Sequence, residues 1–201
     1  MFKQWLFSAA LLASSIVAPT IAAATTKYHT VKTIRPFTAE LVFYETNIPY
    51  DTVLGRLDAA INKTGSVNFL RDFHNSKTKE EQTTLISSII QDRTFLLFLE
   101  TNHKAWLDVY DPTTQHPKAT VYTIGNPNFA ANILPLDYTT GVNIPPRFLI
   151  LETKNGGAKI VYQQFSKIFA PFNKNKELAG HTHDLDVNFG ALFDNVTSTK
   201  V

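Results

Sequence analysis

Two side chains, His103 and Trp106, are the best-placed candidates for chemistry in this sequence. They follow an apolar run and are three residues apart, so a helical turn starting at His103 would direct both toward the same space. A histidine at a strand end can act as a general base or as a metal ligand. The alternative is structural, with the imidazole bonded to a backbone carbonyl and the indole filling the core. The sequence leaves both interpretations open.

The second candidate lies in the turn Gly125-Asn126-Pro127, where a β-rich run stops and a small-residue helix begins. The amide of Asn126 can donate and accept, and the first free N–H groups of the helix attract an anion. The same residues also suit a turn and helix cap without any binding role. Our ligand-binding hypothesis places four residues in one pocket, which would hold a small molecule or a protein partner: His103, Trp106, Asn126 and Arg147.

A polar cluster near the C-terminus, His181-Thr182-His183-Asp184-Leu185-Asp186, is a weak candidate for a metal site. On an extended strand His181 and His183 share a face and could chelate Zn²⁺ or Cu²⁺ with a third ligand from elsewhere. An exposed polar tail is the simpler interpretation. We therefore predict neither a metal ion nor a cofactor.

Composition and missing motifs argue against several classes of function. The sequence has no cysteine, no Gly-x-Ser-x-Gly elbow, no phosphate loop and no dinucleotide fingerprint. Its 19 Lys and Arg against 17 Asp and Glu lack the basic excess that nucleic-acid partners demand. A binding protein is thus favoured over an enzyme, for which His103 would be the general base or metal ligand. A third hypothesis is an exported interaction or effector-like protein that uses its C-terminal tail and the apolar run Ile168–Phe172 as a contact surface.

The first 24 residues have the features of a secretory signal peptide. Lys3 supplies the positive start, Trp5–Val17 the apolar core and Ala22-Ala23-Ala24 the cleavage site. The core is too short to span a bilayer, which takes about 20 residues, and no later segment is long and apolar enough. We expect a mature protein that starts at Thr25 and is secreted, or periplasmic in a bacterium. In a eukaryotic secretory pathway two sequons would be glycosylation candidates: Asn62 and Asn195.

Hydrophobic periodicity predicts alternating strands and helices. Glu40–Thr46 has the composition of a core strand, and Asp51–Lys63 that of a helix with Asp51 as its N-cap. Thr78–Asp92 starts with a capping box and continues as an amphipathic helix. The continuous apolar run Thr94–Leu99 is typical of a strand that is buried on both faces.

The second half of the chain continues this alternation. Ala119–Ile124 is predicted as a strand and Asn128–Leu134 as a short helix. Phe148–Glu152 and Lys159–Gln163 form a hairpin through Asn155-Gly156, because Asn-Gly readily adopts positive φ. Together these elements predict an α+β two-layer sandwich, with a mixed or antiparallel sheet and helices packed on one face. With 44% hydrophobic residues and 15 Phe, one domain can build a core without disulfides.

Three stretches resemble the family known as domain of unknown function 302, which has an acidic-x-His-x-x-Trp motif, a Gly-Asn-Pro turn opening a helix and a Pro-containing entry into a final hairpin. They are Glu100–Leu107, Val121–Ala131 and Thr140–Phe148, with Asn102 in the place of the acidic residue. The resemblance extends from about Ala39 to about Phe169 and implies a fold, not an activity. We therefore divide the chain into a signal peptide (1–24), a flexible N-terminal arm (25–38), the family domain (39–172) and a diverged C-terminal tail (173–201).

Overall fold

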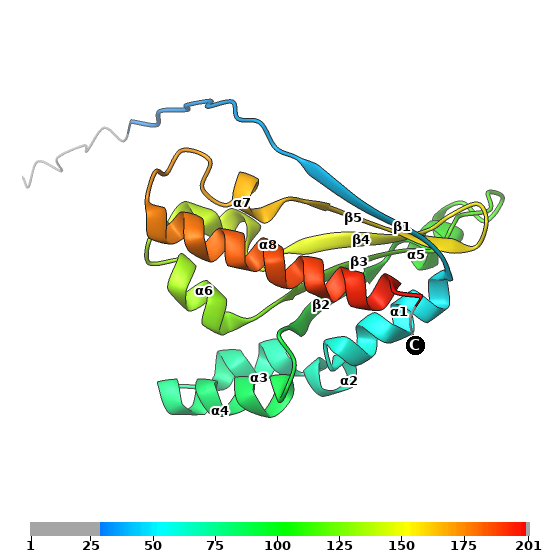
Figure 1. Ribbon diagram of the computed structural model, residues 1–201, viewed down its shortest axis with the longest axis horizontal. Coiled ribbons are helices and arrows are strands. Elements are labelled where there is room, and N and C mark those ends of the chain that lie inside the picture. Colours follow the sequence, from blue (N-terminus) through cyan, green and yellow to red (C-terminus); the bar gives the residue numbers. More distant parts are fainter. Residues whose placement is uncertain (1–28, 200–201) are drawn as a thin grey trace, which may run out of the picture. The chain divides into compact units, whose positions relative to one another are not determined.

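The computed structural model describes residues 29–199, so the predicted signal peptide lies outside the described residues. The chain divides into two units, Met1–Arg35 and Pro36–Val201. The second unit contains a five-stranded antiparallel sheet with the strand order β1-β5-β4-β3-β2 (Figure 1). Its strands are β1 (Leu41–Pro49), β2 (Leu96–Asn102), β3 (Ala119–Gly125), β4 (Arg147–Glu152) and β5 (Gly157–Gln163).

The sheet is accompanied by helices, several of which cover one of its faces (Figure 1). They are α1 (Tyr50–Ala60), α2 (Lys63–Ser66), α3 (Phe69–Asn75), α4 (Lys79–Ile90), α5 (His103–Tyr110), α6 (Pro127–Ile133), the 3-10 helix η1 (Tyr138–Asn143), α7 (Phe165–Ile168) and α8 (Lys176–Thr197). Residues of α1, α6 and α8 share the main core with the sheet, whereas α3 and α4 pack in a second cluster on the start of β2. The predicted α+β sandwich is confirmed.

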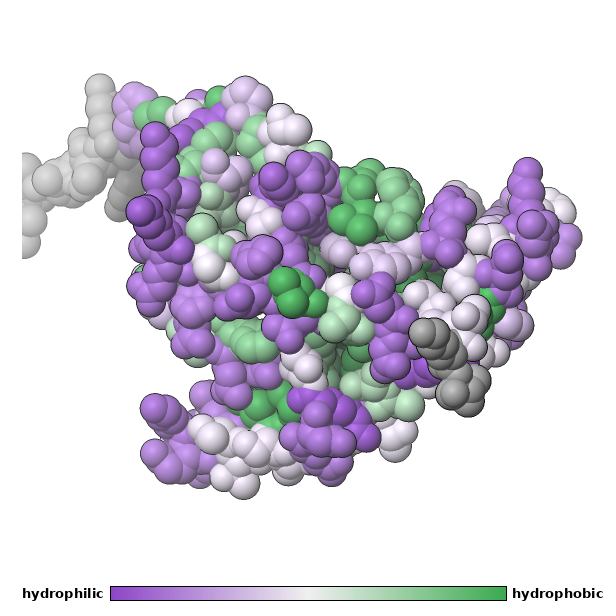
Figure 2. All heavy atoms as spheres, viewed as in Figure 1, coloured by the Kyte–Doolittle hydropathy of each residue, from purple (hydrophilic) through white to green (hydrophobic). Residues whose placement is uncertain are grey.

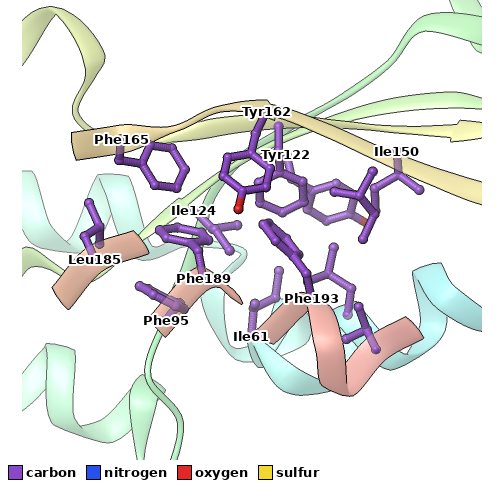
Figure 3. Close-up of a cluster of buried hydrophobic side chains, with 14 of the residues drawn as sticks. Ile61, Phe95, Tyr122, Ile124, Ile150, Tyr162, Phe165, Leu185, Phe189 and Phe193 are labelled. Carbon is purple, nitrogen blue, oxygen red and sulfur yellow. The ribbon is translucent and has the colours of Figure 1, made fainter. Parts of the chain in front are cut away.

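The main core is built on aromatic contacts between α8 and the sheet. Phe189 and Phe193 are fully buried on α8 and lie against the side chains of the strands (Figure 3). The ring of Phe193 is 4.9 Å from that of Phe148 and 5.0 Å from that of Tyr162, and Phe189 stacks on Phe95 at 4.2 Å. Such aromatic pairs contribute about 0.5–1.5 kcal/mol each beyond the area that they bury.

The other face of the sheet is apolar as well. One row of paired residues crosses four strands on this face, in the order Phe43, Val161, Leu149 and Val121. Phe43 is 55% exposed, and the other three are partly exposed. Alternation in an antiparallel sheet usually places polar residues on the open face, so this row departs from the common pattern.

Both strands predicted to be most buried lie at the edges of the sheet. Glu40–Thr46 is wrong as a core strand, because β1 pairs on one side only and every second residue of it is exposed. The run Thr94–Leu99 is buried on both faces only at Phe95, Leu96 and Leu97. Leu99 is 56% exposed, since the register of β2 shifts between Leu97 and Leu99 and β2 is an edge strand of the sheet.

Local signals predicted turns and caps with mixed success. The capping box is present between Thr78 and Glu81, and Gly156 adopts a φ of 78° in the β4–β5 hairpin, so both predictions are confirmed. Asp51 does not cap α1, because Pro49 occupies the N-cap position and Asp51 lies in the first turn. The helix ends at Ala60, before the left-handed residue Asn62 (φ 47°), which caps α2.

The segment predicted as a diverged, exposed tail is mostly helix α8, and it belongs to the core. Its buried residues recur at helical spacing: Leu178, Thr182, Leu185, Phe189, Phe193 and Val196. The apolar run Ile168–Phe172, predicted as a contact surface, also contributes the buried residues Ile168 and Phe169 to this core. Among residues 29–199, no helix is both long and apolar enough to cross a membrane.

Replacing Phe193 by Ala should lower the free energy of unfolding by about 3–5 kcal/mol, because it removes a buried ring and leaves a cavity. Val187→Ala is the matched control on the same helix, since Val187 is 57% exposed. It should change stability by less than about 0.5 kcal/mol. Denaturant unfolding monitored by circular dichroism measures both. Equal effects would show that α8 is not part of the core.

Candidate functional site

His103 and Trp106 lie on α5, whose first residue is His103, so the helical turn that would bring the two side chains together is present. Asn102 caps it by accepting a hydrogen bond from the Ala105 N–H at 3.0 Å. The indole Nε1 of Trp106 donates to Nδ1 of His103 at 3.0 Å, so the two side chains do meet. Trp106 is nevertheless 50% exposed, and no residue of α5 is buried. The structural prediction of a core tryptophan is therefore wrong, because α5 follows an edge strand.

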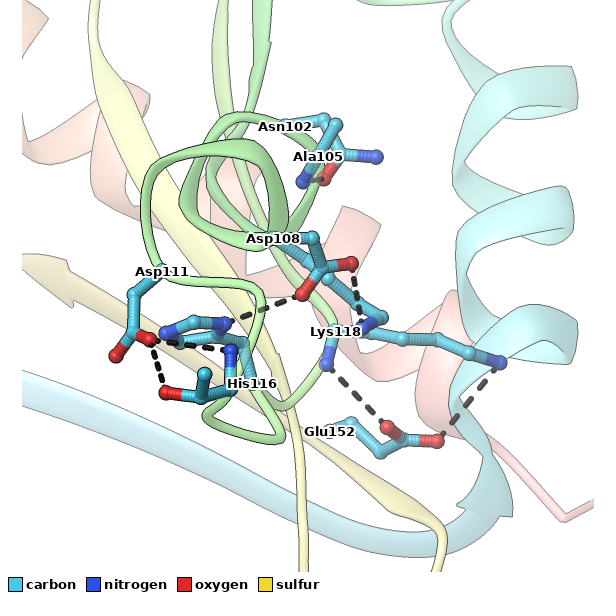
Figure 4. Close-up of polar contacts among 9 residues, drawn as sticks. Asn102, Ala105, Asp108, Asp111, His116, Lys118 and Glu152 are labelled. Atoms are coloured by element: carbon cyan, nitrogen blue, oxygen red, sulfur yellow. Dashed lines mark hydrogen bonds and ion pairs between the residues drawn. The ribbon is translucent and has the colours of Figure 1, made fainter.

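A network of paired polar groups surrounds this end of the sheet (Figure 4). The carboxylate of Asp108 lies 2.8 Å from Nζ of Lys104 and 3.1 Å from Nδ1 of His116. Side-chain hydrogen bonds from Thr114 and Thr113 lower the pKa of Asp111 to about 2. Each carboxylate thus has its own partner, so the network orders the loop after α5.

The four predicted pocket residues do not converge. Along the β2–β3 ladder Leu96 pairs with Gly125, and Asn102 pairs with Thr120. The steps from Leu96 to Asn102 span about 20 Å at 3.4 Å per residue, and His103 and Asn126 lie beyond opposite ends of this ladder. Because antiparallel pairing determines this separation, the prediction of one shared pocket is wrong.

Asn126 is a helix cap that also lines a cavity. Its Oδ1 accepts from the Asn128 N–H at 2.9 Å, and its Nδ2 donates to the Thr94 carbonyl at 3.0 Å. The backbone carbonyl of Asn126 accepts from the N–H groups of Phe129 and Ala130. The first N–H groups of α6 are therefore occupied, and the turn-and-cap interpretation is confirmed.

The cavity beside Asn126 has a volume of about 440 Å³ and lies between α4 and α6. We call it the α4–α6 cavity. Figure 2 shows the surface indented above the α3–α4 pair, which lies at the bottom of the view. The volume lies within the range of about 300–1,000 Å³ that is usual for small-molecule sites. Its walls are mainly aromatic and aliphatic, with Phe73, Ile86, Phe98, Phe129, Ile133 and Phe169 among them.

Helix α4 turns one stripe of side chains toward this cavity, at positions 79, 82, 83 and 86. Ile86 at the inner end is buried, Gln82 is partly buried, and Lys79 and Thr83 are exposed. The spacing i, i+3, i+4, i+7 is that of one helix face. The stripe is therefore apolar at its inner end, at Ile86, and polar at the solvent-exposed mouth of the cavity, at Lys79, Gln82 and Thr83. The sequence predicted both helices but not that they face each other, because the cavity forms only once α6 lies opposite α4.

Arg147 lies outside this cavity, although its neighbour Pro146 lines it. Arg147 is the first residue of β4, and its exposed side chain lines a separate groove of about 280 Å³. Leu41, Leu149 and Val161 of the open sheet face line the same groove. Arg147 is thus near the Asn126 end of the sheet but belongs to a different surface.

A cluster that sequence reasoning missed lies beneath α1. The hydroxyl of Tyr122 donates to Asp58 at 2.6 Å, and Nζ of Lys63 lies 2.6 Å from Glu100 and 3.2 Å from Asp58. Burial lowers the pKa of Lys63, but the hydrogen bonds to Glu100 and Asp58 outweigh it and raise the pKa. Lys63 is therefore held protonated and is a poor nucleophile or base. No sequence motif predicts this cluster, because its members come from three segments that are distant in the sequence.

The histidines of the C-terminal cluster lie on α8 rather than on a strand. His181 and His183 are two residues apart and so point to different sides of the helix, which removes the premise of the chelate prediction. Within residues 29–199, no group of three His, Asp, Glu or Cys side chains is arranged to hold a metal ion.

Of the two sequons, Asn195 is exposed on α8, whereas the Nδ2 of Asn62 donates to the Ile89 carbonyl at 2.8 Å. Glycosylation stays a prediction.

Residues 72–196 match the family described as "Domain of unknown function DUF302". The match covers α8 up to Val196, beyond the predicted end of the family domain at residue 172, and it starts at residue 72 rather than at residue 39. A solved structure of an uncharacterized conserved DUF302 protein from Bacillus stearothermophilus is similar, with a TM-score of 0.55 and 12% identity over 79% of this chain and 98% of that chain. This likeness shows the fold alone. No curated protein matches the chain.

Buried tyrosines predict sensitivity to alkaline pH. Burial is the main cause that raises the pKa of Tyr44, Tyr50, Tyr122 and Tyr162 above 10.0. Because the folded-state pKa exceeds the unfolded one, their contribution to stability is complete below about pH 10 and is lost as the pH rises further. Unfolding free energy should therefore fall above about pH 10, and Tyr122→Phe should reduce the slope. Absorbance at 295 nm should show tyrosines that ionise only on unfolding. Ionisation of every tyrosine in the folded protein would contradict this.

Proposed function

We propose that this chain, which belongs to the DUF302 family, binds an amphipathic small molecule in the α4–α6 cavity. The observation that carries the proposal is the cavity itself, which combines a volume of about 440 Å³ with apolar walls and a polar mouth. Ligand sites in proteins commonly have this composition, with an apolar body for affinity and a few polar groups for orientation. The alternative is that the chain binds a protein partner rather than a small molecule.

The apolar walls favour a ligand with a hydrocarbon or aromatic body. Phe73 and Phe98 contribute from the second cluster, and Phe129 and Ile133 from α6. Burial of each methylene group contributes about 0.8 kcal/mol, or about fourfold in affinity. Affinity should therefore rise with chain length along a series of alkanols and stop rising once the cavity is full.

The enzyme hypothesis has less support from this geometry. His103 accepts a hydrogen bond from Trp106 through Nδ1, and neither residue is among those that line the α4–α6 cavity. The substitution His103→Gln separates the two hypotheses. It should leave ligand binding in the cavity unchanged, whereas a His103-dependent enzyme would lose its activity.

We also propose that the protein is exported, on the basis of the signal-like segment with Trp5–Val17 as its apolar core. The mature chain should begin at Thr25 and be found outside the cytoplasm. N-terminal sequencing of the secreted or periplasmic fraction tests this. A chain that keeps Trp5–Val17 would be an anchored protein instead.

Binding to the cavity can be tested with N-phenyl-1-naphthylamine, a neutral probe that fluoresces in apolar surroundings. The parent protein should bind it, and Thr83→Trp should weaken binding at least tenfold, because the indole would occupy space at the mouth of the cavity. Thr84→Trp is the matched control, since Thr84 is the next exposed residue of α4 but does not line the cavity. Fluorescence titration gives the three dissociation constants.

Two outcomes would count against a ligand site in this cavity. The first is that the parent protein, shown to be folded by circular dichroism, does not increase the fluorescence of the probe. The second is an equal loss of binding in both tryptophan variants, which would place the probe elsewhere.

A further inference from the structure

The polar groups at the mouth of the α4–α6 cavity have no partners of their own. Within residues 29–199, the side chains of Lys79, Gln82, Thr83 and Asn128 make no hydrogen bond or ion pair, and all four line the cavity. Each of them can donate: an ammonium, two amides and a hydroxyl. By contrast, Asn126 nearby uses both ends of its amide within the protein. The mouth thus presents several donors that the fold does not use.

The charge at this mouth has one sign. Lys79 is the only charged residue among those that line the cavity, and no carboxylate lines it. Of the two acidic residues in the first turn of α4, Glu80 and Glu81, neither lines the cavity, and the carboxylate of Glu81 accepts from the backbone N–H groups of Lys77 and Thr78. That carboxylate serves the capping box of α4 rather than the cavity. A ligand entering past Lys79 therefore meets positive charge and hydrogen-bond donors.

We propose that the ligand is an amphiphile with an anionic head group, such as a carboxylate, sulfate or phosphate, and an apolar tail. The head group lies at Lys79, Gln82 and Asn128, and the tail occupies the space between Ile86 and Phe129. This inference rests on the proposed function, since it specifies the ligand class of the same cavity. A charged hydrogen bond to an exposed ammonium contributes to affinity and is weakened by salt.

The test is displacement of N-phenyl-1-naphthylamine by four compounds with ten-carbon chains. Decanoate and decyl sulfate should displace the probe about tenfold more tightly than decan-1-ol, because of the charge-assisted hydrogen bonds. Decyltrimethylammonium should be the weakest of the four. The advantage of the anions should shrink in 0.5 M NaCl, as expected for a site open to solvent. A preference for sulfate over carboxylate, or the reverse, identifies the head group.

Two lysine variants assign the effect to Lys79. Lys79→Gln should bring decanoate to within about twofold of decan-1-ol, since it removes the charge. It should leave binding of the neutral probe unchanged. Lys77→Gln is the control, because Nζ of Lys77 donates to the His74 carbonyl and Lys77 does not line the cavity. This variant should behave like the parent.

The outcomes separate this inference from the proposed function. If neither the neutral probe nor any of the four compounds binds, both the proposed function and this inference are wrong. Binding of the probe with equal affinity for decanoate and decan-1-ol keeps the cavity as a ligand site but overturns the anionic head group. An equal effect of Lys77→Gln and Lys79→Gln also overturns it, because general surface charge would then explain the preference.

Discussion

The contact between α8 and the inward face of the sheet is the interaction on which the rest of the fold depends. Phe189 and Phe193 lie among the rings of β4, β5 and α7, so three parts of the chain meet on one helix. The chain has no cysteine, and its stability must come from such burial. The same helix supplies Leu185 to the α4–α6 cavity and packs against α6. Without α8 both the core and one wall of the cavity would be missing.

The α4–α6 cavity arises because the protein has two hydrophobic clusters rather than one. Ile133 joins α6 to the main core, whereas Ile86, Ile89 and Ile90 join α4 to the second cluster through Leu96 of β2. The two helices thus belong to different clusters, and the space between them is not filled. Close packing usually removes such voids, so an apolar cavity of this size between two well-packed clusters is a feature of functional interest.

Two networks of paired polar groups lie outside the α4–α6 cavity. Asp58, Lys63, Glu100 and Tyr122 satisfy one another beneath α1, and the carboxylates near α5 are paired in the same way. Such networks lower the cost of burying polar atoms and leave little capacity for a ligand. Only one residue of the predicted site, Asn126, lines the α4–α6 cavity. The stripe from Lys79 to Ile86 was predicted as a helix face but not as a binding surface, because sequence periodicity does not identify what the face meets.

The sequence by itself determined the features that depend on residues close together in the chain. The capping box at Thr78 and the hairpin turn at Gly156 follow from local hydrogen bonds and backbone preferences. Only the tertiary structure decided which strands lie at the edges, that His103 and Asn126 are far apart, and that α8 fills the core. Those outcomes depend on strand order and antiparallel register, which are set by contacts between residues distant in sequence. Local patterns cannot specify such contacts, because the same apolar run suits an edge strand, a central strand or a buried helix.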